Sequence, residues 1–171
     1  MTKRIGIIGP ESTGKSTLSL QLAAHFQTQW VPEFARQYLI DINRPYEESD
    51  LLTIAKGQKA KEEQLFRGAN NFLFCDTTLI VVKVWSEHSY GRCDPWIAEQ
   101  VDHMKYDYFF LTDIDMPWVE DPLREHPHMR DYFFDIYKSY LEKEGFPYSL
   151  VSGNEEERLQ LAIAKVGSLI V

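Results

Sequence analysis

The sequence predicts an α/β domain of three layers, in which helices cover both faces of a mostly parallel five-stranded sheet. Short apolar runs alternate with longer segments of helical periodicity, as in doubly wound sheets. A glycine-rich loop follows the first apolar run and precedes a helical pattern. The 171 residues, of which 44% are hydrophobic, suit a single domain over residues 1–171 with a full core.

Five short apolar runs are the expected strands. The first, Arg4 to Ile8, is continuously apolar at its end and stops at Gly9, which is typical of a buried parallel strand. The second is stopped by Pro32, and the third ends at Asp76. In chain order, the strands are expected at residues 4–8, 30–31, 71–75, 108–111 and 148–151.

Helices are expected between these strands. Residues 15–27 place apolar side chains at helical spacing, and residues 47–67 form a long proline-free segment that Gly57 weakens only slightly. Residues 79–82 have strand propensity, but parallel strands need a crossover, so residues 77–90 are predicted to be helical. The other helices are expected at 33–42, 94–104, 129–145 with a cap at Gly145, and 154–169 with a cap at Asn154.

The charge balance and the cysteines limit the classes of partner. The 26 acidic and 18 basic side chains give a net charge of -8, which argues against nucleic acid or an anionic membrane. Cys75 and Cys93 form no CxxC pair, and no apolar run is long enough for a signal peptide or a membrane span. The sequence therefore predicts a cytoplasmic protein with a small-molecule partner, and it leaves the oligomeric state open.

The glycine-rich loop matches GxxxxGK[ST] between a predicted strand and a predicted helix. Its glycines let successive backbone N–H groups face an anion, and the helix dipole adds positive potential. Lys15 can reach the β- and γ-phosphates of ATP, Ser16 can ligate Mg2+, and Thr17 can donate to the α-phosphate. We therefore expect a P-loop NTPase domain that binds ATP and Mg2+ through Gly9, Glu11, Ser12, Thr13, Gly14, Lys15, Ser16 and Thr17.

Asp76 ends the third strand, where P-loop proteins place a carboxylate that orders Mg2+. The same side chain could instead cap the next helix, and both roles can hold together. The residue that follows is Thr77, whereas hydrolysing P-loop motors usually have a glutamate there to activate water. The sequence therefore favours phosphoryl transfer to a substrate over hydrolysis.

Glu33 and Arg36 come just after the second strand, and the carboxyl ends of parallel strands surround the site. Glu33 could accept the proton of a substrate hydroxyl, and Arg36 could hold a substrate or a phosphate. The alternative is an exposed ion pair on a helix, and the sequence leaves both open.

Residues 112–130 are rich in proline and charge and are expected to form a lid. Arg124, in preference to Arg130, would close onto the transferring phosphoryl group, although most charged loops are simply solvated. Among the aromatic side chains, Trp85 and Trp118 are the candidates for stacking on a base, and the others are assigned to the core. The five histidines are expected to be structural or exposed.

Several segments occur together in an informative order. They read Gly-Pro-Glu-Ser-Thr-Gly-Lys-Ser-Thr, Pro-Glu-Phe-Ala-Arg, Phe-Cys-Asp-Thr, Val-Trp-Ser-Glu-His-Ser-Tyr-Gly and Asp-Met-Pro-Trp-Val-Glu-Asp-Pro-Leu-Arg. In this order the chain resembles the ribosylnicotinamide kinase domain of NadR-type proteins over about residues 3–165. The phosphate loop is shared by many families, whereas the other segments are much more specific.

The resemblance implies phosphorylation of nicotinamide riboside by ATP, giving nicotinamide mononucleotide and ADP. It implies that Glu33 and Asp76 face the ribose hydroxyl and the metal, and it leaves open which of the two is the base. Nucleoside kinases generally place the base after the second strand, which favours Glu33. By the same resemblance, ATP and Mg2+ would be bound by Gly14, Lys15, Ser16 and Thr17, the substrate cleft would be lined by Arg36, Trp85 and Trp118, and Arg124 would belong to the lid.

The chain departs from the best-known NadR proteins because it begins at the kinase strand and has no HxGH-type nucleotidyltransferase motif. We expect that it does not adenylylate its product, and that a separate nicotinamide mononucleotide adenylyltransferase would do so. Two other functions stay open, a kinase for a different nucleoside and a P-loop ATPase or switch without a small-molecule acceptor. A guanine switch is disfavoured because residues 111–115 lack the Asn-Lys pair that reads guanine.

Overall fold

The computed structural model describes residues 1–169 and contains one sheet of five parallel strands in the order β2-β3-β1-β4-β5. The strand β1 lies at the centre, with Ile5 opposite Phe74 on one side and Tyr108 on the other. The strands are β1 (Lys3–Ile8), β2 (Gln29–Val31), β3 (Phe72–Asp76), β4 (Tyr108–Thr112) and β5 (Tyr148–Val151). The predicted mostly parallel five-stranded sheet is confirmed.

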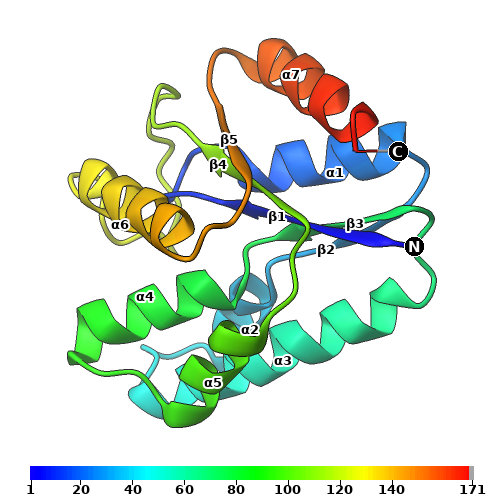
Figure 1. Ribbon diagram of the computed structural model, residues 1–171. Coiled ribbons are helices and arrows are strands. Elements are labelled where there is room, and N and C mark those ends of the chain that lie inside the picture. Colours follow the sequence, from blue (N-terminus) through cyan, green and yellow to red (C-terminus); the bar gives the residue numbers. More distant parts are fainter. Residues whose placement is uncertain (170–171) are drawn as a thin grey trace.

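Helices cover both faces of this sheet, which confirms the doubly wound arrangement (Figure 1). Helices α1 (Lys15–His25) and α7 (Glu155–Gly167) pack on one face. The helices on the other side of the sheet include α4 (Leu79–Tyr90) and α6 (Arg130–Lys143). The remaining helices are α2 (Phe34–Ile42), α3 (Glu48–Phe66) and α5 (Pro95–His103).

The strand β4 shows why the central strands are continuously apolar. Tyr108 and Phe110 pack into the cluster beneath α1 and α7, whereas Phe109 and Leu111 pack into the cluster beneath α4 and α6. Successive side chains of a strand point to opposite faces, and both faces of this sheet are covered. Alternation of polar and apolar residues is therefore absent from β4, and the strand is recognised by its short apolar run.

The helix α4 forms despite the strand propensity of its first four residues. Thr78 caps it, because the Thr78 hydroxyl accepts a hydrogen bond of 3.3 Å from the amide of Ile80. The helix ends at Gly91, which has a φ of 68°. Its first residues are apolar because they pack against the sheet, so the tertiary context overrides the local propensity. The helix predicted over residues 77–90 is confirmed.

Gly57 lies in the middle of α3, where α2 crosses it. A Cβ atom at Gly57 would lie 2.2 Å from Cζ of Phe34, so only glycine lets the phenyl ring pack directly on the α3 backbone. The amide of Phe34 also donates a hydrogen bond of 2.9 Å to the side chain of Gln58. These contacts fix the start of α2, which immediately follows Glu33.

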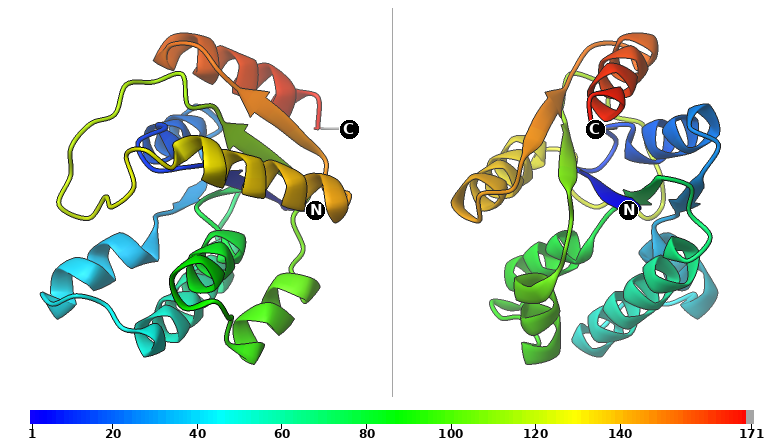
Figure 2. Two further views of the ribbon diagram at one scale, coloured as in Figure 1. Left: turned by 90° about the vertical axis from the view of Figure 1, so that its left-hand side faces the viewer. Right: turned by 45° about the vertical axis from the view of Figure 1, so that its right-hand side comes forward.

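The carboxyl ends of the five parallel strands meet at one edge of the sheet, and the N-terminus lies at the opposite edge (Figure 1). There the ammonium group of Lys3 donates a hydrogen bond of 2.8 Å to the carbonyl of Leu169. Residues 113–129, which connect β4 to α6 beyond the carboxyl ends, contain no helix or strand (Figure 2). No helix within residues 1–169 has the length and the apolar character needed to cross a membrane.

Candidate functional site

The phosphate loop leads from β1 to α1 and is closed by its own hydrogen bonds. The Thr13 hydroxyl donates to the carbonyl of Pro10 at 2.7 Å and lies 2.6 Å from the hydroxyl of Thr112 at the end of β4. Gly9 packs against the same residue, because a Cβ atom there would lie 2.1 Å from Oγ1 of Thr112. The loop is therefore attached to two neighbouring strands, and no sequence motif marks Thr112 for this role.

Lys15 lies inside this loop and is surrounded by acidic side chains. Its ammonium group donates a hydrogen bond of 2.6 Å to the carbonyl of Pro10. Desolvation lowers the pKa of Lys15, while the carboxylates of Glu33, Asp76 and Glu11 act in the opposite direction. The site thus holds a cation that can turn from a loop carbonyl to an arriving phosphate.

Asp76 is 1% exposed, and one of its carboxylate oxygens accepts a hydrogen bond of 2.5 Å from the Ser16 hydroxyl. The other oxygen, Oδ1, has no hydrogen-bond partner among the described residues. Burial, together with the nearby charge of Glu33, raises the pKa of Asp76 to about 6. A cation that reaches this buried carboxylate would strongly stabilise its charged form.

The Ser16 hydroxyl and the Asp76 carboxylate fit Mg2+, which prefers hard oxygen ligands and usually keeps phosphate and water ligands as well. Within residues 1–169 no cluster of three His, Cys, Asp or Glu side chains could hold a metal ion. A metal at Ser16 and Asp76 would therefore need ligands from the phosphates and from water. That is the usual arrangement for Mg2+ bound together with a nucleotide.

Two cavities open at this edge of the sheet. The larger, of about 330 Å³, is lined mainly by apolar side chains of α2, α3, α4 and α6, with Trp85 among them. The smaller, of about 170 Å³, is formed by the phosphate loop together with Arg36 and Arg124. The two cavities share part of their lining, namely Glu11, Lys15, Glu33, Leu39 and Leu123.

Glu33 is the N-cap residue of α2 and lies where the two cavities meet. Its position is fixed because Gln58 binds the next amide, that of Phe34, and also approaches the carbonyl of Thr77 at 3.4 Å. Arg36 borders only the smaller cavity and forms an ion pair with Asp121 in the segment 113–129. Glu33 and Arg36 are therefore not paired with each other, and both face the site.

Trp85 lies in an aromatic cluster beside the larger cavity. Its ring stacks on Phe133 with a centroid distance of 5.5 Å and on His126 with a distance of 5.1 Å. His88 contacts the same group at 5.0 Å from Phe133. The sequence predicts structural or exposed positions for these histidines, and the structure places both in the cluster around Trp85.

The segment 113–129 rests on the phosphate loop. The carboxylate of Glu11 accepts hydrogen bonds of 3.2 Å from the amides of Glu125 and His126, and the Ser12 hydroxyl accepts one of 2.9 Å from the amide of Val119. Arg124 reaches the smaller cavity and donates to the carbonyl of Val119. The arginine that the sequence favours is thus at the phosphate side of the site.

Trp118 lies elsewhere in this segment. Its ring is 6.0 Å from the guanidinium carbon of Arg124 and 5.9 Å from that of Arg130, and it does not line either of the two cavities. Arg130 donates to the carbonyls of Ser12, at 3.3 Å, and Met116, at 2.8 Å. The structure therefore brings Trp85 to the larger cavity and leaves Trp118 between two arginines.

Several residues that line the larger cavity belong to no motif that predicts a site. Thr77 borders the larger cavity with a φ of 71°, a left-handed conformation that is costly for a β-branched residue and is typical of functional sites. Arg44 also lines this cavity and is held by an ion pair of 2.8 Å with Asp50. Further residues of this cavity come from the start of α3 and its preceding turn, namely Pro45, Tyr46, Leu51 and Ile54.

Known proteins share this architecture. The family model described as "AAA domain" matches residues 4–158. The chain is 31% identical over 128 residues to the trifunctional NAD biosynthesis/regulator protein NadR of Escherichia coli (strain K12). The aligned region covers 71% of this chain and 31% of that protein. The chain spans about a third of the length of the curated relatives that it matches.

Solved structures show the same fold at lower identity. A NadR protein crystallised in complex with NR superposes with a TM-score of 0.86 at 21% identity, over 98% of this chain and 51% of the other. Deoxyadenosine kinase from M. mycoides with bound products superposes with a TM-score of 0.67 at 15% identity, over 96% of this chain and 99% of the other. The loop, the parallel sheet and these matches together confirm the resemblance to NadR-type proteins, and the chain belongs to the AAA-domain family of P-loop proteins.

Proposed function

We propose that the chain is an ATP-dependent nucleoside kinase that transfers the γ-phosphoryl group to a ribose 5′-hydroxyl. One observation carries this proposal: a polar cavity on the phosphate loop and an apolar cavity suited to a nucleoside meet at Lys15 and Glu33. A donor and an acceptor bound in the two cavities would meet at that shared wall. An NTPase that uses only water as its acceptor has no need of the larger apolar cavity.

We propose nicotinamide riboside as the acceptor and nicotinamide mononucleotide as the product. The support is the similarity to NadR, named for NAD biosynthesis, and to a NadR structure described as a complex with NR. The larger cavity, of about 330 Å³ with Trp85 in its lining, suits a nucleoside whose base can stack on an aromatic ring. The cytoplasmic location and a separate adenylyltransferase partner stay predictions.

The residues have separate tasks in this proposal. The phosphate loop holds the donor, and Lys15 and Arg124 offset charge on the transferring group. Glu33, at the junction of the cavities, accepts the proton of the attacking hydroxyl. Ser16 and Asp76 would hold Mg2+, which supplies positive charge to the phosphates. The position of Asp76 behind Ser16, outside both linings, supports Glu33 as the base.

The test is an ADP-release assay with Mg-ATP and a panel of nucleosides that includes nicotinamide riboside. We expect saturable turnover that depends on nicotinamide riboside. Lys15→Ala should reduce it at least 100-fold, about the loss on removing one electrostatic contact to a transition state. Lys61→Ala is the matched control, since Lys61 is exposed on α3 and lines neither cavity.

The other outcomes separate the alternatives. Turnover with a different nucleoside would retain the kinase and reject nicotinamide riboside as the acceptor. ADP release that no nucleoside of the panel changes would reject the kinase function and leave an ATPase or a nucleotide-dependent switch.

A further inference from the structure

Arg158 is a buried cation that the proposed reaction does not use. It lies in the first turn of α7 and is only 3% exposed. Its guanidinium group donates to the carbonyls of Thr13 at 2.7 Å, Gly153 at 2.8 Å and Asp113 at 3.1 Å, and it pairs with the carboxylate of Asp115. A buried arginine thus joins the phosphate loop to the ends of β4 and β5.

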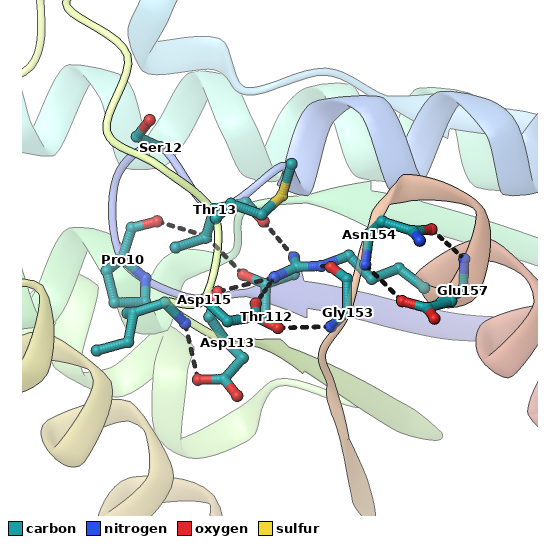
Figure 3. Close-up of polar contacts among 12 residues, drawn as sticks. Pro10, Ser12, Thr13, Thr112, Asp113, Asp115, Gly153, Asn154 and Glu157 are labelled. Atoms are coloured by element: carbon teal, nitrogen blue, oxygen red, sulfur yellow. Dashed lines mark hydrogen bonds and ion pairs between the residues drawn. The ribbon is translucent and has the colours of Figure 1, made fainter.

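The ends of these strands are also joined to each other. The carboxylate of Asp115 accepts a hydrogen bond of 2.5 Å from the amide of Gly153, and the capping box between Asn154 and Glu157 fixes the start of α7. Figure 3 shows Thr13, Asp113, Asp115 and Gly153 gathered around this group of contacts. Because the guanidinium group is planar and its N–H groups point in fixed directions, these partners define one orientation of Arg158.

The contact with Thr13 has a consequence for the next residue. The carbonyl of Thr13 and the N–H of Gly14 belong to one planar trans peptide, so they point in opposite directions. Arg158 lies outside the lining of the smaller cavity and binds this carbonyl, so the Gly14 N–H is directed away from Arg158, to the inner side, where Gly14 lines that cavity. A charged donor on the carbonyl also polarises the peptide, which strengthens its N–H as a donor.

Arg130 makes the equivalent contact with the preceding peptide. It donates to the carbonyl of Ser12 at 3.3 Å, which directs the N–H of Thr13 to the inner side in the same way. Two arginines from α6 and α7 thus bind successive carbonyls of the phosphate loop from outside. Neither is in the lining of the cavity that the loop forms.

We propose that Arg158, assisted by Arg130, is a positioning residue for phosphate binding: it fixes the Thr13–Gly14 peptide so that the Gly14 N–H faces the phosphates before they arrive. This inference rests on the proposed binding of ATP. A loop that is already oriented loses less conformational entropy when a nucleotide binds. Arg158 therefore acts through the loop and does not touch the nucleotide.

The test measures nucleotide binding and the state of the Gly14 amide together. Mg-ADP and nicotinamide riboside are titrated into the wild type, Arg158→Met and Arg158→Lys by calorimetry. Each protein is labelled with 15N-glycine, since nine glycines give few resonances. We expect Arg158→Met to weaken ADP binding at least 10-fold, to leave nicotinamide riboside binding within twofold, and to lose the downfield shift of the Gly14 proton in the ADP complex.

Arg158→Lys should recover part of the ADP affinity, because lysine keeps the positive charge but not the planar guanidinium group with its several N–H donors. Tyr106→Phe is the control for a lost part-buried contact, as it removes a 2.8 Å hydrogen bond to Glu62. It should leave ADP binding and the Gly14 shift unchanged. A folded Arg158→Met protein with wild-type ADP affinity and Gly14 shift would overturn the inference.

Two further results are decisive. If the wild type itself binds no ADP, the proposed function fails, and the inference fails with it. If the wild type binds ADP but Arg158→Met does not fold, Asp115→Asn decides, because it removes the charge that orients Arg158. We expect a threefold or larger loss of ADP affinity with an upfield Gly14 shift, and no change in either would reject the inference.

Discussion

Asp76 is held where its own charge is unfavourable. Its carboxylate is 1% exposed, receives a hydrogen bond from Ser16 on one oxygen, and has the negative charge of Glu33 nearby. These surroundings raise its pKa to about 6, so the folded protein binds a proton that the unfolded chain releases near its usual value of 3.8. The folded state therefore loses stability as the pH rises through the range from about 4 to about 6.

Asp76→Asn should remove this cost while it keeps an oxygen for the Ser16 hydroxyl. We expect the unfolding free energy at pH 7 to rise by up to ~3 kcal/mol, the equivalent of the raised pKa. The gain should vanish below about pH 4, where the carboxyl group is protonated in both states. Urea unfolding of both proteins between pH 4 and pH 8 measures it, and a variant that is less stable at pH 7 would contradict the prediction.

The residues of the phosphate site differ in how far the sequence could predict them. Lys15 and Ser16 belong to a motif whose spacing defines its geometry, and Glu33 and Asp76 follow strands whose ends must meet. Arg158 is 145 positions from its partner Thr13, so no local pattern connects them. Its only signal was its position in the first turn after the fifth strand, at the same edge of the sheet. The catalytic and binding roles themselves stay predictions.

Gly57 determines how closely two helices approach. Helix propensity alone would make Gly57→Ala stabilising by about 1 kcal/mol. The Phe34 ring occupies the place of the new methyl group, so we expect instead a loss of roughly 1–2 kcal/mol from overpacking. Because Phe34 follows Glu33, turnover in the ADP-release assay should also fall. Thermal unfolding and that assay measure both effects.

Gly167→Ala is the control for this substitution. Gly167 is the last residue of α7, and a Cβ atom there would have no heavy atom within 4 Å. It should leave turnover unchanged and alter stability by less than about 1 kcal/mol. If both alanine variants stabilise the protein, the contact of Phe34 with α3 does not limit the approach of the helices.

The elements were predictable because each has its own local signal. Apolar runs identified the strands, and caps such as Asn154 identified helix ends. The order of the strands in the sheet has no such signal, since the pairing of β1 with β3 and β4 joins segments that are far apart in the chain. Gly57 likewise reads only as a weak point of a helix until the ring that covers it is known.

At the scale of the whole molecule, residues 113–129 link the two halves of the site. They are attached to the phosphate loop through Glu11 and Ser12 and to α2 through the ion pair of Asp121 with Arg36. An ion pair with one partner half exposed contributes little by itself, so these attachments can change when ligands bind. The role of this segment as a lid stays a prediction.

We expect amide hydrogen exchange in residues 113–129 to slow when ligands bind. ADP and nicotinamide riboside together should slow it more than either ligand alone, because they fill the two cavities that the segment borders. Exchange mass spectrometry with each ligand and with both measures this effect. Unchanged exchange in this segment under conditions in which calorimetry detects binding of both ligands would show that it is no lid.

The contact between Lys3 and Leu169 brings the start of β1 next to the segment that follows α7. A short linker could join these two residues far from the phosphate loop, because Lys3 is the first residue of β1 and the loop follows the last residue of that strand. New ends could then be opened at the exposed turn that begins with Gly91, between α4 and α5. Such a circular permutant would be synthesised with α5 first and β1 in its middle, yet the same sheet could assemble around β1.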